Sequence, residues 1–181
     1  YASIYPMYDF AQKIGGDKIE LNIITPPGVE PHDWEPTAKL MGEMEKADVL
    51  IYNGAGMENW VDKVLDAFGR NSVMAVDASR GIDLLKTLET EHEHTGHIDP
   101  HIWLNPINAK KQAENIKNAF IQADPANKEF YEMNYKKFSD EIRDLDDLYK
   151  ESLVNIKSRD IVVSHAAFGY LAQRYNLKQL P

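Results

Sequence analysis

The side chains best suited to chemistry in this sequence are six histidines, which fall in three places. His32 lies in the segment 28–36, four histidines lie between residues 92 and 101, and His165 stands alone. Neutral imidazole nitrogen is a favoured ligand of Zn²⁺, whereas the chain has no cysteine to supply a thiolate. The sequence therefore indicates a histidine-based metal site, and it excludes disulfides and cysteine-dependent catalysis.

His32, His101 and His165 are predicted to lie on loops next to strands or helices. His32 follows a strand predicted at 21–25, His101 precedes a helix, and His165 follows a strand predicted at 160–164. In open α/β sheets, ligands bind at the carboxyl ends of the strands. Taken singly, each histidine is more often a surface or capping residue; together they predict a zinc-type site. Three polar neighbours are candidates to orient the rings: Asp33, Asp99 and Ser164.

The remaining histidines, His92, His94 and His97, lie in an acidic loop at 89–97. Such tracts bind metals loosely, and a solvated polar loop is an equally good interpretation. The spacing is similar to the His-x-His-x-Asp-His motif of metallo-β-lactamase-type hydrolases, but Gly96 stands where that motif needs Asp. We expect a mobile loop that is at most a secondary metal site.

The elements that must position these loops alternate between helix and strand over the first ~120 residues, which is typical of a parallel α/β layer. The run at 47–52 is almost entirely apolar, which predicts a strand buried on both faces. We interpret residues 1–123 as an N-terminal α/β lobe. The predicted helices are 6–14, 37–46, 58–68 and 106–123, and the predicted strands are 21–25, 47–52 and 72–76.

A single long helix is predicted at 124–157, with Asp124 as N-cap and Pro125 in its first position. About thirty residues at ~1.5 Å each would span about 45 Å, enough to bridge two lobes or to form a coiled coil. Its apolar positions recur every three or four residues: Tyr131, Tyr135, Phe138, Ile142, Leu145, Tyr149, Leu153 and Ile156.

Residues 158–181 are interpreted as the start of a second α/β lobe that is truncated in this chain. A buried strand is predicted at 160–164, a helix at 165–174, and a further strand from about Leu177. One strand and one helix bury little apolar surface by themselves. We therefore expect self-association or a swapped arrangement through 158–181, unless the rest of the chain covers this surface.

Composition excludes several classes of protein. Twenty Lys and Arg against 29 Asp and Glu give a net charge of −9, and no basic cluster offers a footprint for nucleic acid. The apolar fraction of 43% argues against disorder, and no apolar run approaches the ~20 residues of a membrane span. The sequence opens at Tyr1 without Met, so we expect a processed chain whose targeting segment lies outside it.

Five phrases stand out, in order along nearly the whole chain: 3–10 (SIYPMYDF), 31–37 (PHDWEPT), 47–58 (ADVLIYNGAGME), 99–104 (DPHIWL) and 164–170 (SHAAFGY). Together they resemble the zinc- and manganese-binding receptor lipoproteins of bacterial metal ABC importers, the family with the TroA-like fold. The resemblance implies two parallel-sheet lobes, joined by one long helix, with the metal held between them.

The resemblance also implies a ligand set. His32 and His101 match the ligands of the first lobe, and His165 matches the first ligand of the second lobe. Imidazole at 165 resembles the zinc-type members and favours Zn²⁺ over Mn²⁺, which prefers oxygen ligands. The family's fourth ligand, a carboxylate late in the second lobe, falls beyond this sequence. The loop at 89–97 resembles an insert of the zinc members.

The function implied is that of an extracytoplasmic receptor, at the cell surface or in the periplasm, that captures Zn²⁺ and delivers it to a membrane ABC permease. It would not be an enzyme, and it would contact the membrane only through an N-terminal lipid anchor outside this sequence. Two alternatives remain open from the residues. One is a zinc-dependent hydrolase with Glu30, Asp33 or Glu35 as general base, and the other is a cell-surface adhesin.

Overall fold

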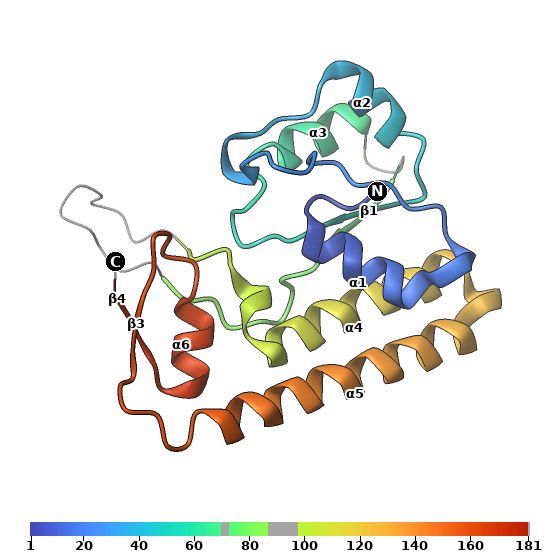
Figure 1. Cartoon of the computed structure of the whole chain (residues 1–181). Coiled ribbons are helices and arrows are strands. Elements are labelled where there is room, and N and C mark those ends of the chain that lie inside the picture. The colour runs from blue at the N-terminus through green and yellow to red at the C-terminus, as the bar shows by residue number, and fades with distance from the viewer. Residues whose placement is uncertain (70–72, 87–97, 181) are drawn as a thin grey trace.

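The computed structural model describes residues 1–69, 73–86 and 98–180, which form an α/β fold with two small parallel sheets. No helix in these ranges combines the length and apolarity needed to cross a bilayer. Figure 1 gives the arrangement of the elements. The helices are α1 (Tyr5–Gly15), α2 (Ala38–Met44), α3 (Val61–Phe68), α4 (Pro106–Ala123), α5 (Lys128–Ser152) and α6 (Gly169–Tyr175), and the strands are β1 (Val49–Tyr52), β2 (Met74–Asp77), β3 (Asp160–Val162) and β4 (Lys178–Leu180).

The first sheet separates two apolar clusters. β1 pairs in parallel with β2, so that Leu50 lies opposite Ala75 and Ile51 opposite Val76. Leu50 is 0% exposed and belongs to the cluster under α2 and α3, whereas Ile51 is 1% exposed and belongs to the cluster with α1, α4 and α5. Figure 1 shows these helices on opposite sides of β1. The predicted burial of this strand on both faces is confirmed.

The strand predicted at 21–25 is wrong in extent, because this segment makes only an isolated bridge between Ile23 and Ala2. Ala2 also bridges Ile51, which places it between the segment and β1. The pairing ends where the amide of Thr25 donates to the carbonyl of Ser3. It cannot continue, because two prolines follow Thr25 and proline has no N–H to donate.

The long helix is shorter than predicted at both ends. Pro125–Asn127 form a separate 3₁₀ turn, so α5 begins at Lys128 with Asn127 as its N-cap, and it ends at Ser152. Asp124 does not cap α5; its carboxylate accepts hydrogen bonds from the side chains of Asn127 and Tyr131. α5 packs along α1 and α4 of the same chain, an arrangement different from the coiled coil left open by the sequence.

The apolar stripe of α5 gives way to a buried charge in its second half. Phe138 and Ile142 are buried as predicted, but Leu145 is 46% exposed and Asp146 takes the inward position. Both Asp146 oxygens accept hydrogen bonds of 2.6 Å from the guanidinium of Arg174 in α6. The contact between the long helix and α6 is therefore an ion pair as well as an apolar one.

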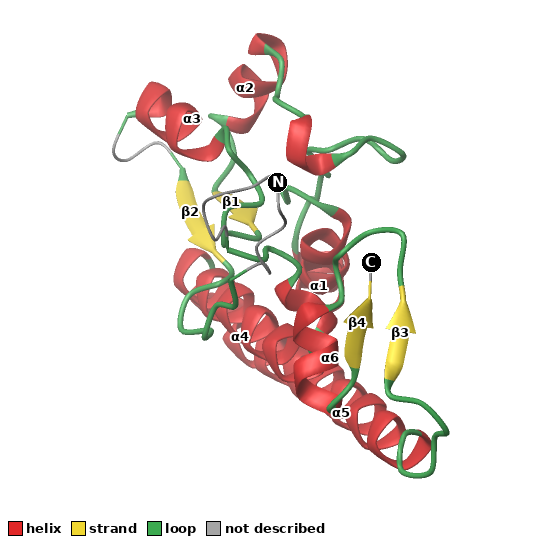
Figure 2. Cartoon of the chain, turned by 90° about the vertical axis from the view of Figure 1, so that its left-hand side faces the viewer, coloured by secondary structure: helices red, strands yellow, loops and turns green. Residues whose placement is uncertain are grey.

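The second sheet consists of β3 and β4, which pair in parallel with Asp160 opposite Lys178 (Figure 2). The helix predicted at 165–174 begins only at Gly169, so residues 165–168 form a loop. β2 begins at Met74, and the predicted start of that strand at residue 72 falls outside the described residues. The division into lobes at 1–123, 124–157 and 158–181 stays a prediction.

Candidate metal centre

Three imidazoles from separate segments meet at one point. His32 lies on a 3₁₀ turn (Pro31–Asp33), His101 immediately precedes another (Ile102–Leu104), and His165 lies on the loop before α6. One ring nitrogen of each lies within 4.8 Å of those of the other two. Figure 1 shows α6 beside the segment that leads into α4. The structure thus brings together the three histidines that the sequence singled out.

The rings are close enough for one ion. The Nε2 atoms of His101 and His165 are 3.1 Å apart. Nitrogens bound at about 2.0–2.1 Å to one tetrahedral zinc lie about 3.3 Å from each other. One ring nitrogen of His32 lies within 4.8 Å of the nitrogens of the other two rings, so all three rings are within reach of a single ion.

Asp99 orients His101. One oxygen of its carboxylate lies 2.8 Å from Nδ1 of His101 and accepts a 3.0 Å hydrogen bond from the backbone amide of the same residue. A carboxylate only accepts hydrogen bonds, so we assign the proton of this contact to Nδ1. The lone pair of neutral His101 then lies on Nε2, toward the other two rings. Asp99 was one of the three neighbours predicted to orient a ring; the side chain of Asp33 is outside the described part.

The same assignment gives the direction of the contact between the two rings. Since Nε2 of His101 has a lone pair, the 3.1 Å contact is a hydrogen bond donated by Nε2–H of His165. A metal ion bound by both Nε2 atoms would replace this hydrogen bond.

The three rings differ in their access to solvent. His101 is buried, His32 is half-buried and His165 is exposed. A carboxylate oxygen of Glu30 lies 3.8 Å from Nε2 of His32, and the amide group of Asn59 donates to the carbonyl of His32 at 3.5 Å. Exposure to solvent therefore decreases from His165 through His32 to His101.

A buried amide pair supports the turn that carries His101. The side chain of Asn53, directly after β1, donates to the carbonyl of Pro100 at 2.9 Å. Gln112 of α4 donates in turn to the side-chain oxygen of Asn53 at 2.9 Å. Both residues are fully buried. The sequence reasoning missed them, although Asn53 carried a signal, since a polar residue directly after a strand buried on both faces needs a partner.

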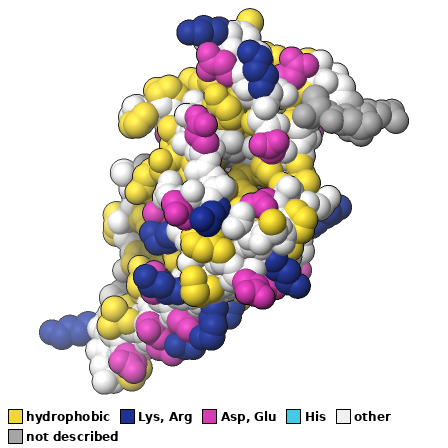
Figure 3. Space-filling model, turned by 90° about the vertical axis from the view of Figure 1, so that its right-hand side faces the viewer, with side chains coloured by type: hydrophobic (Ala, Val, Ile, Leu, Met, Phe, Trp, Pro, Cys, Tyr) yellow, Lys and Arg dark blue, Asp and Glu magenta, His cyan; other side chains and the backbone are white. Residues whose placement is uncertain are grey.

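The remaining three histidines, His92, His94 and His97, lie outside the described residues, so a secondary metal site there stays a prediction. Among the described residues, no histidine is visible on the face drawn in Figure 3, where cationic and anionic side chains are interspersed. The described imidazoles gather elsewhere, where His32, His101 and His165 meet.

Three converging imidazoles in this α/β fold are a set of side chains that could hold one metal ion. The chain belongs to the family of the periplasmic component A of zinc-uptake complexes, whose model matches residues 1–181.

Individual relatives agree with this membership. The chain is 41% identical over 187 residues to the high-affinity zinc uptake system protein ZnuA of Bacillus subtilis, and the match covers 99% of this chain and 59% of that protein. The crystal structure of the metal-dependent lipoprotein YcdH of B. subtilis superposes with a TM-score of 0.91 at 39% identity, covering 99% of this chain and 65% of that one. The Zn(II)-bound ZnuA-like domain of Streptococcus pneumoniae AdcA gives 0.89 at 35% identity, covering 99% and 64%. The chain thus spans about three fifths of the length of the B. subtilis relative.

Proposed function

We propose that this chain binds Zn²⁺ through His32, His101 and His165, and that it acts as the capture part of a receptor that passes zinc to a membrane ABC permease. The observation that carries the proposal is the convergence of three imidazoles from three separate segments. Membership of a zinc-uptake family supports it independently. The chemistry required is binding and release, so the chain is proposed not to be an enzyme.

Zinc is favoured over manganese by the donor set. Three neutral imidazoles suit a borderline-soft ion, whereas Mn²⁺ prefers carboxylate and carbonyl oxygen. A fourth position remains for a water or for the carboxylate that the family resemblance implies. Mn²⁺ is the second candidate, and a preference for it in a direct competition would contradict the assignment.

The proposed place of action is outside the cytoplasm, in the periplasm or at the cell surface. Relatives named as periplasmic components and lipoproteins of zinc uptake support this location. The proposed partners are the metal ion and the permease, with membrane attachment through an N-terminal lipid anchor. The net charge of −9 argues against a nucleic-acid partner.

Competition titration against a chromogenic zinc chelator tests the proposal. The variant H32A/H101A/H165A should lose zinc binding, and each single variant should weaken it. The matched control is H92A/H94A/H97A, which removes the same number of histidines. X-ray absorption at the zinc edge of the loaded protein should show nitrogen neighbours at about 2.0–2.1 Å. Equal affinity of the wild-type chain and the first triple variant would overturn the proposal.

The hydrolase alternative predicts a different result. Glu30 lies near His32, and it would have to serve as general base for a metal-bound water. The zinc-loaded chain should then turn over activated esters or phosphoesters in a zinc-dependent way, and Glu30→Gln should abolish that turnover. A receptor shows no turnover in the same assay. An adhesion role stays a prediction.

A further inference from the structure

The hydroxyl of Tyr170 is built into a short antiparallel ladder next to the candidate metal centre. Lys86 and Ile98 form a bridge, and the adjacent pair is Leu85 and Asp99. The amide of Asp99 donates to the carbonyl of Leu85 at 2.9 Å. An antiparallel hydrogen-bonded pair normally exchanges two such bonds. Here the second bond is replaced by a relay through another element.

That relay is Tyr170, from α6. Its hydroxyl accepts a 2.9 Å hydrogen bond from the amide of Leu85 and donates a 2.9 Å hydrogen bond to the carbonyl of Asp99. The ring is 1% exposed and packs against Ala55 and Ile102. Burial raises the pKa of Tyr170, so the hydroxyl stays protonated and able to donate. Tyr170 is therefore fixed both by the packing of its ring and by the two hydrogen bonds of its hydroxyl.

Asp99 is the residue that makes this contact relevant to metal binding. Its backbone carbonyl is held by Tyr170, and its carboxylate holds the ring of His101. The carboxylate also lies directly against α6, since a Cβ placed on Gly169 would be 2.7 Å from its second oxygen. Helix α6, which follows His165, therefore contacts Asp99 through both Tyr170 and Gly169.

We propose that Tyr170 is a positioning residue of the metal centre: by relaying between Leu85 and Asp99, it fixes the turn of His101 relative to the loop of His165 before metal binds. This inference rests on the proposed zinc function. Without the hydroxyl, the amide of Leu85 and the carbonyl of Asp99 lose their partner. A buried amide and a buried carbonyl that have lost their partner tend to pair with each other. The amide of Leu85 should then donate directly to the carbonyl of Asp99, which draws Asp99 away from His101.

The test compares Tyr170→Phe with Tyr131→Phe. Tyr131 is also 1% exposed, and its hydroxyl donates a 2.8 Å hydrogen bond to Asp124, a contact that does not involve the three histidines. Both variants remove one buried hydroxyl, so both should lower the melting temperature. Only Tyr170→Phe should weaken zinc binding, by about 10- to 100-fold, as is usual when a residue supporting a ligand is lost. Chelator competition measures this effect.

Two readouts separate positioning from a general loss of stability. The ligand-field spectrum of the Co²⁺-loaded protein should change in Tyr170→Phe and remain as in the wild type in Tyr131→Phe. In the metal-free protein, the imidazole NMR signals of His101 and His165 should change only in Tyr170→Phe. This second readout needs no metal, so it still tests the inference if the wild-type chain fails to bind zinc.

Gly169→Ala provides a second variant should Tyr170→Phe fail to fold. Alanine is a better helix former than glycine, but its methyl group would lie only 2.7 Å from a carboxylate oxygen of Asp99, so the carboxylate has to shift. It should also weaken zinc binding and shift the His101 signals. Zinc affinity within about twofold of wild type, with unchanged Co²⁺ and NMR spectra in the folded variants, would overturn the inference.

Discussion

The Nε2 atoms of His101 and His165 lie 3.1 Å apart although 64 residues separate them in the sequence. The contact joins the segment before α4 to the loop before α6, so these two parts of the chain meet at the site itself. The carboxylate of Asp99 lies on one side of His101, and the exposed ring of His165 lies on the other.

Asp99→Asn should weaken zinc binding by about 10- to 100-fold, because the amide orients His101 less well and removes the charge that favours a metal-bound imidazole. Chelator competition at pH 7 measures the change. Asp124→Asn is the control, since its carboxylate also accepts side-chain hydrogen bonds but from Asn127 and Tyr131. If both variants bind zinc as the wild type does, Asp99 has no role in metal binding.

The variant H92A/H94A/H97A should keep zinc affinity close to that of the wild type. The reason is that three converging imidazoles already form a complete set of protein ligands at His32, His101 and His165. Equilibrium competition decides the question. A loss of a hundredfold or more, roughly 2.7 kcal/mol, would make the loop at 89–97 the primary site.

Protonation of Glu58 should raise the free energy of unfolding as the pH falls from about 7 toward mildly acidic values. Burial raises the pKa of Glu58 to about 7, against the lowering effect of hydrogen bonds from Ser3 and from the amides of Asn53 and Gly54. The folded state therefore holds this proton more tightly than the unfolded state. The contribution is present below the unfolded pKa near 4.5 and is lost as pH rises through about 7.

Urea unfolding at pH 5 and pH 8 tests this effect, with Glu58→Gln as the comparison. The free energy of unfolding of the wild type should fall between these pH values by on the order of 2 kcal/mol more than that of the variant. All other titratable groups are common to the two proteins, so their contributions cancel in the comparison. Parallel pH profiles for the two proteins would show that Glu58 does not titrate in this window.

The buried ion pair of Asp146 and Arg174 should dominate the acid sensitivity of the contact between α5 and α6. Hydrogen bonds from Arg174 hold the pKa of Asp146 well below its ordinary value. A lowered folded pKa means that this stabilisation is present above the ordinary pKa of an aspartate, about 3.9, and is lost as pH falls further. Stability should therefore drop steeply below about pH 4.

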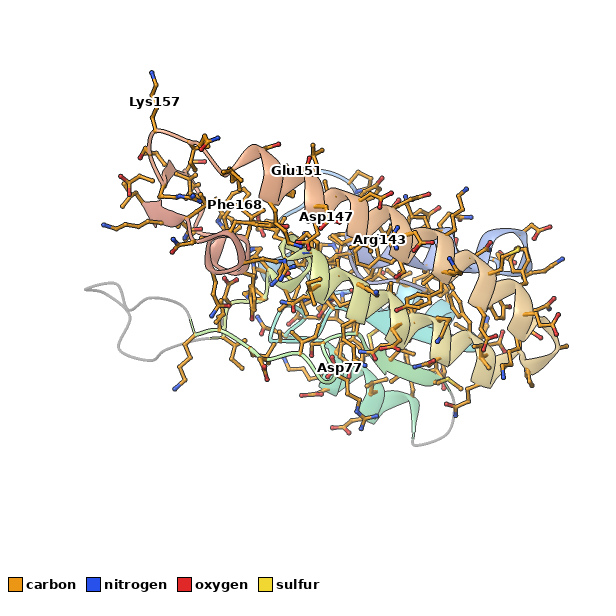
Figure 4. All side chains as sticks on the ribbon, turned by 90° about the horizontal axis from the view of Figure 1, so that it is seen from below. Asp77, Arg143, Asp147, Glu151, Lys157 and Phe168 are labelled. Carbon is orange, nitrogen blue, oxygen red and sulfur yellow. The ribbon has the colours of Figure 1, made fainter. Side chains whose placement is uncertain are left out.

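Asp146→Asn should lower the free energy of unfolding by about 2–3 kcal/mol at pH 7, because it leaves Arg174 without its charge partner in a partly buried position. Asp147→Asn is the matched control, since the neighbouring Asp147 lies on the outer side of α5 with Arg143 and Glu151 (Figure 4). It should change stability by no more than about 0.5 kcal/mol. Equal effects of the two substitutions would show that burial of the pair contributes nothing.

Self-association through residues 158–181 stays a prediction, and Val162 is the residue to test it. Val162 is 79% exposed on β3, and an apolar side chain in a sheet is a natural contact point. Val162→Lys should shift the sedimentation coefficient toward that of the monomer, whereas Val154→Lys, at a residue 64% exposed outside this region, should not. A wild-type chain that sediments as a monomer at every concentration would contradict the expectation.

The placement of the three histidines on loops could be predicted from the sequence because local rules apply to these segments. Each of the three histidines stands on a loop or turn beside a regular element. The alternation of helix and strand was enough to place these loops. The run at 47–52 was predictable for the same reason, since its length and apolarity allow little else than a strand buried on both faces.

Contacts between distant segments could not be predicted in the same way. Asp146 occupies an inward position of α5 only because Arg174 lies opposite it, and the pattern of apolar residues favoured Leu145 instead. Likewise, nothing near Tyr170 in the sequence indicates that its hydroxyl completes a ladder between Leu85 and Asp99. Such pairings depend on tertiary packing, which overrides local preference.

The position of Ala2 between Ile23 and Ile51 has a consequence for the rate at which this protein folds. The amino group of Tyr1 donates to the carbonyl of Val49, a contact that closes a loop over 48 residues. Closing this loop costs chain entropy, and the cost comes before the apolar clusters on the two sides of β1 have formed and can offset it. We expect folding over milliseconds to seconds, with the early collapse confined to α4 and α5, whose contacts are local in the sequence.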